Sequence, residues 1–120
     1  MYILNVQIAN LIYSFFNLPN LNELSGEYIL NECILNRATS MLSSSEMKST
    51  IVNNIPKSHL PDKWRRLDNE SILKSDYKFT RTSSINILKY ILNKHRINYE
   101  LYKTIENRKN IYILKITKDT

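Results

Sequence analysis

Four polar side chains between residues 82 and 93 could form one binding surface. They recur at spacings of three and four residues: Thr82, Asn86, Lys89 and Asn93. Residues at these spacings lie above one another on one face of a helix, and Tyr90 lies beside them. Hydroxyl, amide and ammonium groups in such a row can hydrogen-bond to a polar or anionic partner. Such a row is a candidate binding surface, although exposed polar residues on a helix face are ordinarily only solvated.

Two basic clusters could add positive charge to such a surface. One is Lys63-Trp64-Arg65-Arg66, and the other is the turn Asn107-Arg108-Lys109-Asn110. Trp64 could stack on a base beside the two arginines. Large aromatic side chains usually serve the core, however, so packing is its expected role. Basic turns also occur on many hairpins as solvated surface, so neither cluster identifies a partner by itself.

Residue types used in catalysis and metal binding are few. His59, His95 and Cys33 show none of the spacings of metal sites, and no nucleophilic set of serine, histidine and acid is recognisable. His95 falls on an apolar helix face, where a core or capping role is expected. The single glycine, Gly26, excludes the glycine-rich loops that bind nucleotide phosphates. We therefore expect a non-catalytic protein without a metal or cofactor.

The composition is basic and favours a polyanionic partner. The 120 residues include 17 Lys and Arg against 11 Asp and Glu, a formal net charge of +6. Such a balance favours nucleic acid first and an anionic membrane surface second. Asn, Ile, Lys and Tyr are frequent while Gly and Pro are few, which indicates an AT-rich genome: a virus, a phage, an organelle or a low-GC bacterium.

Cys33 is the only cysteine, so the chain has no intramolecular disulfide. This usage fits a reducing, intracellular compartment: host cytoplasm or nucleus for a viral protein, the mitochondrion for an organelle-encoded one. Because Cys33 falls among apolar helix positions, a small core residue is expected there. The apolar N-terminal stretch is too short and too polar for a membrane span, and it lacks the features of a secretory signal.

The apolar pattern predicts an α+β fold that is mainly helical, within a single domain over 1–120. We expect a helical part over 1–55, a linker over 56–67 and a second part over 68–117. In the helical part, apolar spacing predicts three helices: one over 3–16 with a stripe that includes Leu4, Leu11 and Ile12, one over 26–42 capped by Ser25, and one around Met47, Ile51 and Val52 that ends before Pro56.

Residues 68–117 predict a short helix, a turn, a long helix and a hairpin. The short helix covers 69–75, with Ile72 and Leu73 turned inward. The long helix begins at Thr82 or Ser83 and buries a face with these members: Ile85, Leu88, Ile91, Leu92 and His95. After Arg96 the apolar period changes from 3.6 to 2, which predicts a half-buried strand. That strand includes Ile97, Tyr99, Leu101 and Ile105; a polar turn over 106–110 and a return strand over 111–116 follow.

This stretch resembles the winged helix-turn-helix superfamily of DNA-binding proteins. The matching segments are SILKS as support helix, DYKFT as turn, RTSSINILKYILNKH as recognition helix and INYELYKTIENRKNIYILKI as wing. The small polar start Thr82-Ser83-Ser84 and the short connection Lys94-His95-Arg96-Ile97 are also typical of the superfamily. The resemblance covers 68–117 and does not extend to the first 65 residues.

The resemblance implies a small regulatory DNA-binding protein in which the row Thr82, Asn86, Lys89 and Asn93 enters the major groove. Asn86 would be the residue best suited to read adenine through two hydrogen bonds. Other residues would contact phosphate or the minor groove: Lys78, Arg81 and Ser83 near the start of the recognition helix, and Lys103, Arg108 and Lys109 on the wing. The cluster Lys63, Trp64, Arg65 and Arg66 would form a secondary basic patch.

Two other classes of function remain open. The same basic residues could contact RNA in a structural subunit of an organellar (mitochondrial) ribosome or another ribonucleoprotein. A viral protein that binds a host protein would need no nucleic acid. In each case the N-terminal apolar helices could supply a surface for a homodimer or another assembly partner.

Overall fold

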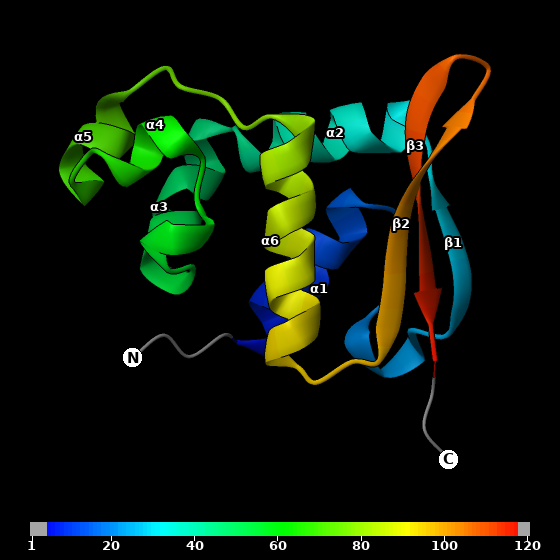
Figure 1. Ribbon diagram of the computed structural model, residues 1–120. Coiled ribbons are helices and arrows are strands. Elements are labelled where there is room, and N and C mark those ends of the chain that lie inside the picture. The colour runs from blue at the N-terminus through cyan, green and yellow to red at the C-terminus, as the bar shows by residue number, and fades with distance from the viewer. Residues whose placement is uncertain (1–4, 118–120) are drawn as a thin grey trace.

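The computed structural model describes residues 5–117 as an α+β fold, which confirms the predicted fold class. The described elements follow in this order: α1 (Val6–Phe15), the 3-10 turn η1 (Leu21–Glu23), β1 (Gly26–Leu30), α2 (Glu32–Leu42), α3 (Ser45–Asn54), the 3-10 turn η2 (Lys57–His59), α4 (Asp62–Arg65), α5 (Asn69–Lys74), α6 (Arg81–Lys94), β2 (Tyr99–Glu106) and β3 (Lys109–Ile116). The strands form an antiparallel sheet in the order β1-β3-β2. Figure 1 shows α6 between this sheet and the group α3–α5.

The segment 26–42 is not the single helix that its apolar spacing predicts. Gly26–Leu30 is a strand that pairs with β3, and α2 begins after Asn31, whose side-chain oxygen accepts the Ile34 N–H at 2.9 Å. A short apolar run fits either a strand or a helix, and the strand that decides between them here lies at the other end of the chain. Gly26 adopts a φ of +81°, a conformation that glycine reaches without strain.

The first predicted helix is present as α1, and it begins at Val6. Ile12 is buried as expected, but Leu11 is 43% exposed, so the prediction that placed Leu11 on the buried stripe was wrong. Leu4, the first residue of that stripe, lies outside the described residues. The third predicted helix is α3, and its apolar residues Ile51 and Val52 are buried.

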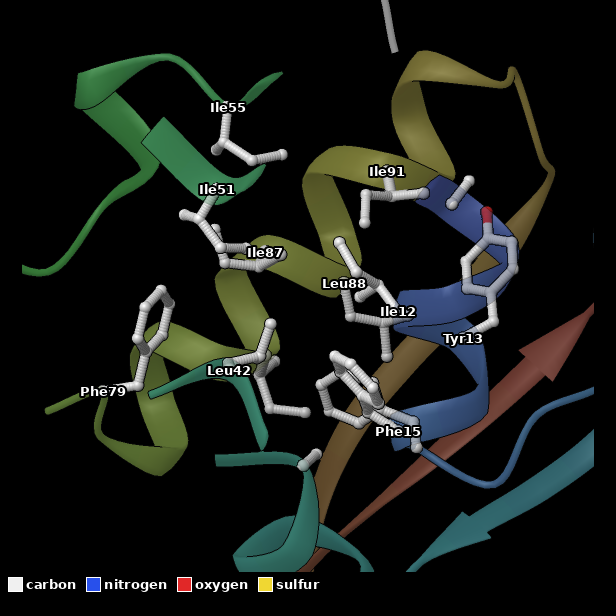
Figure 2. Close-up of a cluster of buried hydrophobic side chains, with 14 of the residues drawn as sticks. Ile12, Tyr13, Phe15, Leu42, Ile51, Ile55, Phe79, Ile87, Leu88 and Ile91 are labelled. Atoms are coloured by element: carbon white, nitrogen blue, oxygen red, sulfur yellow. The ribbon is translucent and has the colours of Figure 1, made fainter. Parts of the chain in front are cut away.

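Core residues pack against every face of α6 except its polar face. Ile85, Leu88 and Leu92 are each at most 1% exposed, and they belong to one hydrophobic cluster with residues from α1, α2, α3 and the sheet. In Figure 2, side chains of α6 lie between those of α1, such as Ile12, and those of α3, such as Ile51. This burial fixes the rotation of α6 about its axis, because a wide apolar face leaves a narrow polar face outside.

Residues 56–67, predicted as a linker, contribute to the core. Leu60 is 4% exposed and Trp64 is completely buried. The Trp64 indole N–H donates to the Tyr77 carbonyl at 3.2 Å, and its ring meets Phe79 edge-on with centroids 4.9 Å apart. Packing, the expected role of Trp64, is therefore what the structure shows. We call η2 through α4, residues 57–65, the ridge.

The short helix predicted over 69–75 is α5, with Ile72 buried as expected. Leu73 is 45% exposed, so its predicted inward orientation was wrong. The start of α6 also differs from the prediction. Thr80 is the N-cap: its hydroxyl accepts the Ser83 N–H at 3.1 Å, and the Ser83 hydroxyl accepts the Thr80 N–H at 2.8 Å. This reciprocal pair satisfies N–H groups that the helix leaves unbonded.

The predicted hairpin is present, with a longer return strand and a tighter turn than expected. The turn is only Asn107 and Arg108, with φ values of +50° and +65°. Positive φ at both positions is what a two-residue turn between twisted strands requires. Ile105, predicted to be half-buried, is 71% exposed and pairs with Asn110 close to the turn. Cys33 is also exposed, so its predicted place in the core was wrong.

Candidate nucleic-acid interface

The polar row on α6 is exposed as the sequence predicts. Burial of the apolar face leaves these four side chains at the surface: Thr82, Asn86, Lys89 and Asn93. All four line one side of an open groove with a volume of about 1000 Å³. The other side of the groove is formed by the ridge and by Asp76, Tyr77 and Lys78 from the loop before α6. We call this the α6 groove.

Positive charge predominates in the α6 groove. Its cationic side chains outnumber its two acids, Asp62 and Asp76, and they are Lys63, Arg65, Lys78, Lys89 and Lys94. Arg65 forms an ion pair with Asp62. The four lysines have no ion-pair partner among residues 5–117, so their charge is available to an anionic ligand.

Aromatic rings line the same groove. Tyr77 is 43% exposed, and the Lys63 ammonium lies 5.0 Å from its ring centroid, within the range of a cation–π contact. Across the groove, the rings of His59 and Tyr90 lie 4.6 Å apart at 44° and join the ridge to α6. Trp64 is completely buried and cannot stack on a ligand in the groove. Lys63, Arg65 and Arg66 of the same cluster are exposed.

Two residues predicted to contact phosphate are held within the protein instead. Arg81 donates to Glu32 at 3.1 Å and to the Asn36 amide oxygen at 2.8 Å. Lys109 contacts the other Glu32 carboxylate oxygen at 2.8 Å. The hydrogen bonds from Lys109 and Arg81 lower the pKa of Glu32, and the bond to Glu32 raises the pKa of Lys109. The carboxylate thus joins the starts of α2, α6 and β3.

Glu32 was not singled out from the sequence. One local signal could have indicated it, namely its place in the first turn of a helix, where an acidic residue is favoured. Its two partners, however, lie at distant points of the chain. Ser83 is likewise a structural residue, because its hydroxyl is bonded within the capping pair and the residue is only 8% exposed. The structure therefore brings together only part of the predicted set.

The remaining predicted contacts are exposed. Lys78 lies in the loop before α6, Lys103 on β2 and Arg108 at the hairpin tip. Within the described part of the chain, none of these three cations forms an ion pair. They are the predicted cationic contacts to phosphate or the minor groove that the fold leaves available, and Lys89 remains available in the row of α6.

Comparison with known proteins found no matching family model, no matching curated protein and no matching solved structure. Among residues 5–117, no cluster of histidine, cysteine and acidic side chains is suited to hold a metal ion. None of the described helices has both the length and the apolar character needed to cross a membrane.

Proposed function

We propose that this chain is a small DNA-binding protein of the winged helix-turn-helix kind that acts by binding and without catalysis. In this proposal α6 is the recognition helix and the β2–β3 hairpin is the wing. The observation that carries it is the exposed row of α6, in which Asn86 and Lys89 stand on a helix whose other faces are buried. A helix with its side chains is about 10–12 Å across, which suits a major groove about 12 Å wide.

The packing around α6 supports this proposal, but it gives the role of support helix to a different helix. The sequence resemblance assigned that role to residues 69–75. The helix bonded to α6 is α2, through Thr39 and Ser84, whose hydroxyls are 2.9 Å apart, and through Arg81 with Glu32. In the proposal, α2 and α6 are therefore the helix pair, and α3–α5 form an insertion between them. The pairing of β3 with β1 then ties the wing to the strand that precedes α2.

The proposed contacts are of two types: cationic side chains contact phosphates, and Asn86 contacts a base. Lys78, near the start of α6, and Arg108, at the hairpin tip, would contact phosphates on either side of the groove that α6 enters. Asn86 would read a base, because its amide can both donate to and accept from adenine. Phosphate contacts supply most of the affinity and its dependence on salt, while base contacts supply sequence preference.

The proposal is tested by fluorescence-anisotropy titration with duplex DNA and with structured RNA at two salt concentrations. Salt-sensitive binding that prefers duplex DNA is expected. Arg108→Ala should weaken that binding and reduce the salt slope by about 0.9, as for the loss of one phosphate contact. Lys115→Ala removes an equal charge from an exposed position of β3 at the end of the hairpin away from the turn, and it serves as the control. A preference for RNA would instead favour the ribonucleoprotein subunit, and absence of binding to both would remove nucleic acid as the partner.

A further inference from the structure

We infer that the α6 groove binds a single-stranded stretch of nucleic acid, with phosphates at its lysines and a base against Tyr77. This inference rests on the proposed function for the class of partner. It adds that the α6 groove receives a single-stranded segment, which would occupy the row of α6 in place of a duplex. It assigns a role to the ridge, which the winged-helix proposal leaves without one.

The charges on the two walls fit a chain of phosphates. Lys63 and Lys78 lie on the wall formed by the ridge and the loop before α6, and Lys89 and Lys94 lie on the α6 wall. A strand between the walls would meet ammonium groups on both sides along its length. Because the four lysines have no ion-pair partner in the described residues, binding would break no internal ion pair of theirs.

The exposed aromatic ring in the groove favours a single strand over a duplex as the ligand. In a duplex the faces of the bases are covered by their stacked neighbours, and an aromatic side chain gains no base face to stack on. In a single strand every base has an available face, and stacking on an aromatic ring is largely independent of sequence. Tyr77 is 43% exposed within the groove, and its position is fixed because its carbonyl accepts the bond from the buried Trp64.

Lys63 adds to the recognition at the same place. Its ammonium lies over the Tyr77 ring, 5.0 Å from the centroid, so a base that stacks on this ring would displace the ammonium toward a neighbouring phosphate. A nucleotide presents these two groups together. The combination of a positively charged groove with aromatic rings is the general design of surfaces that bind single strands.

The experiment measures anisotropy of a fluorescent oligothymidine and of a duplex, with wild-type protein and three variants. Tyr77→Ala should weaken binding of the single strand by about 5- to 150-fold, the range for loss of one stacked base. Tyr77→Phe keeps the ring and should bind nearly as wild type. Tyr102→Ala removes an exposed tyrosine from the sheet and should have no effect. Thermal unfolding of each variant checks that the fold is kept.

A double variant tests whether two of the lysines contact phosphates. Lys63→Ala with Lys78→Ala should reduce the salt slope for the single strand by about 1.4, two contacts at about 0.7 each. Should Tyr77→Ala fold normally and bind the single strand as tightly as Tyr102→Ala, the inference is wrong. Wild-type binding to duplex alone would overturn the inference and leave the proposed function standing. Binding to the single strand alone would support the inference and overturn duplex recognition, and binding to neither would overturn both.

Discussion

Arg81 and Lys109 are held by opposite oxygens of one carboxylate, that of Glu32, at 3.1 and 2.8 Å. The shared carboxylate fixes the first residue of α6 relative to the tip of the hairpin, because Lys109 directly follows the turn. In the proposed function these two elements contact DNA together, so their relative position determines which phosphates they reach. It also withdraws two positive charges from the surface. The ion pairs therefore align α6 with the hairpin. They also leave Arg81 and Lys109 unavailable for contacts to phosphate.

Glu32→Gln should release both cations and strengthen binding to polyanions. One negative charge is removed and two phosphate contacts become possible, so the salt slope for duplex DNA should steepen by up to about 2. Faster amide hydrogen exchange in the hairpin should accompany this change, because the tie between β3 and α6 is lost. Glu100→Gln, which removes an exposed acid from the outer face of β2, is the matched control. If both variants steepen the slope equally, net charge is responsible and the ion pairs are not.

The same ion pairs should make the hairpin sensitive to acid. Because the pKa of Glu32 is lowered in the folded protein, its stabilising contribution is present above the ordinary value of 4.5 and is lost as the pH falls through the lowered folded pKa. Hairpin amide exchange measured from pH 6 downward should therefore accelerate only below about pH 4.5 in the wild type. In Glu32→Gln this acceleration should be much reduced.

His95 should destabilise the fold at mildly acidic pH. It is the C-cap residue of α6, its Nε2 is buried without a partner among the described residues, and burial lowers its pKa below the ordinary 6.5. The unfolded chain then takes up a proton before the folded protein does, so stability falls as the pH drops from 6.5 through the folded pKa. The midpoint of thermal unfolding should be lower at pH 5 than at pH 7.5.

His95→Gln should reduce this difference between the two pH values. His59→Gln, at the exposed histidine of the ridge, is the control and should keep the wild-type fall. An equal fall in all three proteins would assign the pH dependence to other groups.

The small side chain of Ser43 should make a substantial contribution to the free energy of unfolding. It is 4% exposed, and its hydroxyl accepts the Phe79 N–H at 2.8 Å and donates to the Thr39 carbonyl at 2.7 Å. Ser43→Ala leaves the buried Phe79 N–H without a partner, which costs about 1–3 kcal/mol of unfolding free energy. Ser40→Ala, at an exposed position of the same helix, should change the free energy little. Urea unfolding measures both, and similar values for the two variants would contradict this role.

The sequence predicts well the elements whose signal is local. The helix α6, the change to strand period after Arg96 and the basic hairpin all follow from spacing within one segment, and the exposed row of α6 follows from its apolar face. Two features could not be predicted this way. The strand Gly26–Leu30 exists because β3 pairs with it, and Arg81 is occupied because Glu32 lies beside it in the fold. Both depend on contacts between distant parts of the chain.

The role of residues 56–67 shows the same limit. Prolines and charged residues in this segment indicate a linker, and only its packing shows that Trp64 lies in the core. Trp64→Ala should therefore lower the free energy of unfolding by about 3–5 kcal/mol, the usual cost of such a truncation in a core. Arg66→Ala, next to it on the exposed side, should change it by less than about 0.5 kcal/mol. A small effect of Trp64→Ala would restore the linker interpretation.

Asn86→Ala separates base reading from plain charge attraction. The side chain is exposed at the middle of the α6 row, so truncation should leave the fold intact. If Asn86 hydrogen-bonds a base, the variant should lose about 1–3 kcal/mol of discrimination between a selected site and random duplex, while its affinity for random duplex is unchanged. Its salt slope should also be unchanged, since no phosphate contact is lost. Lys89→Ala is the matched comparison one turn further along the row, and it should weaken binding to both duplexes and reduce the slope by about 0.9. Equal losses on selected and random DNA for Asn86→Ala would mean that α6 does not read sequence, and that binding is set by charge alone.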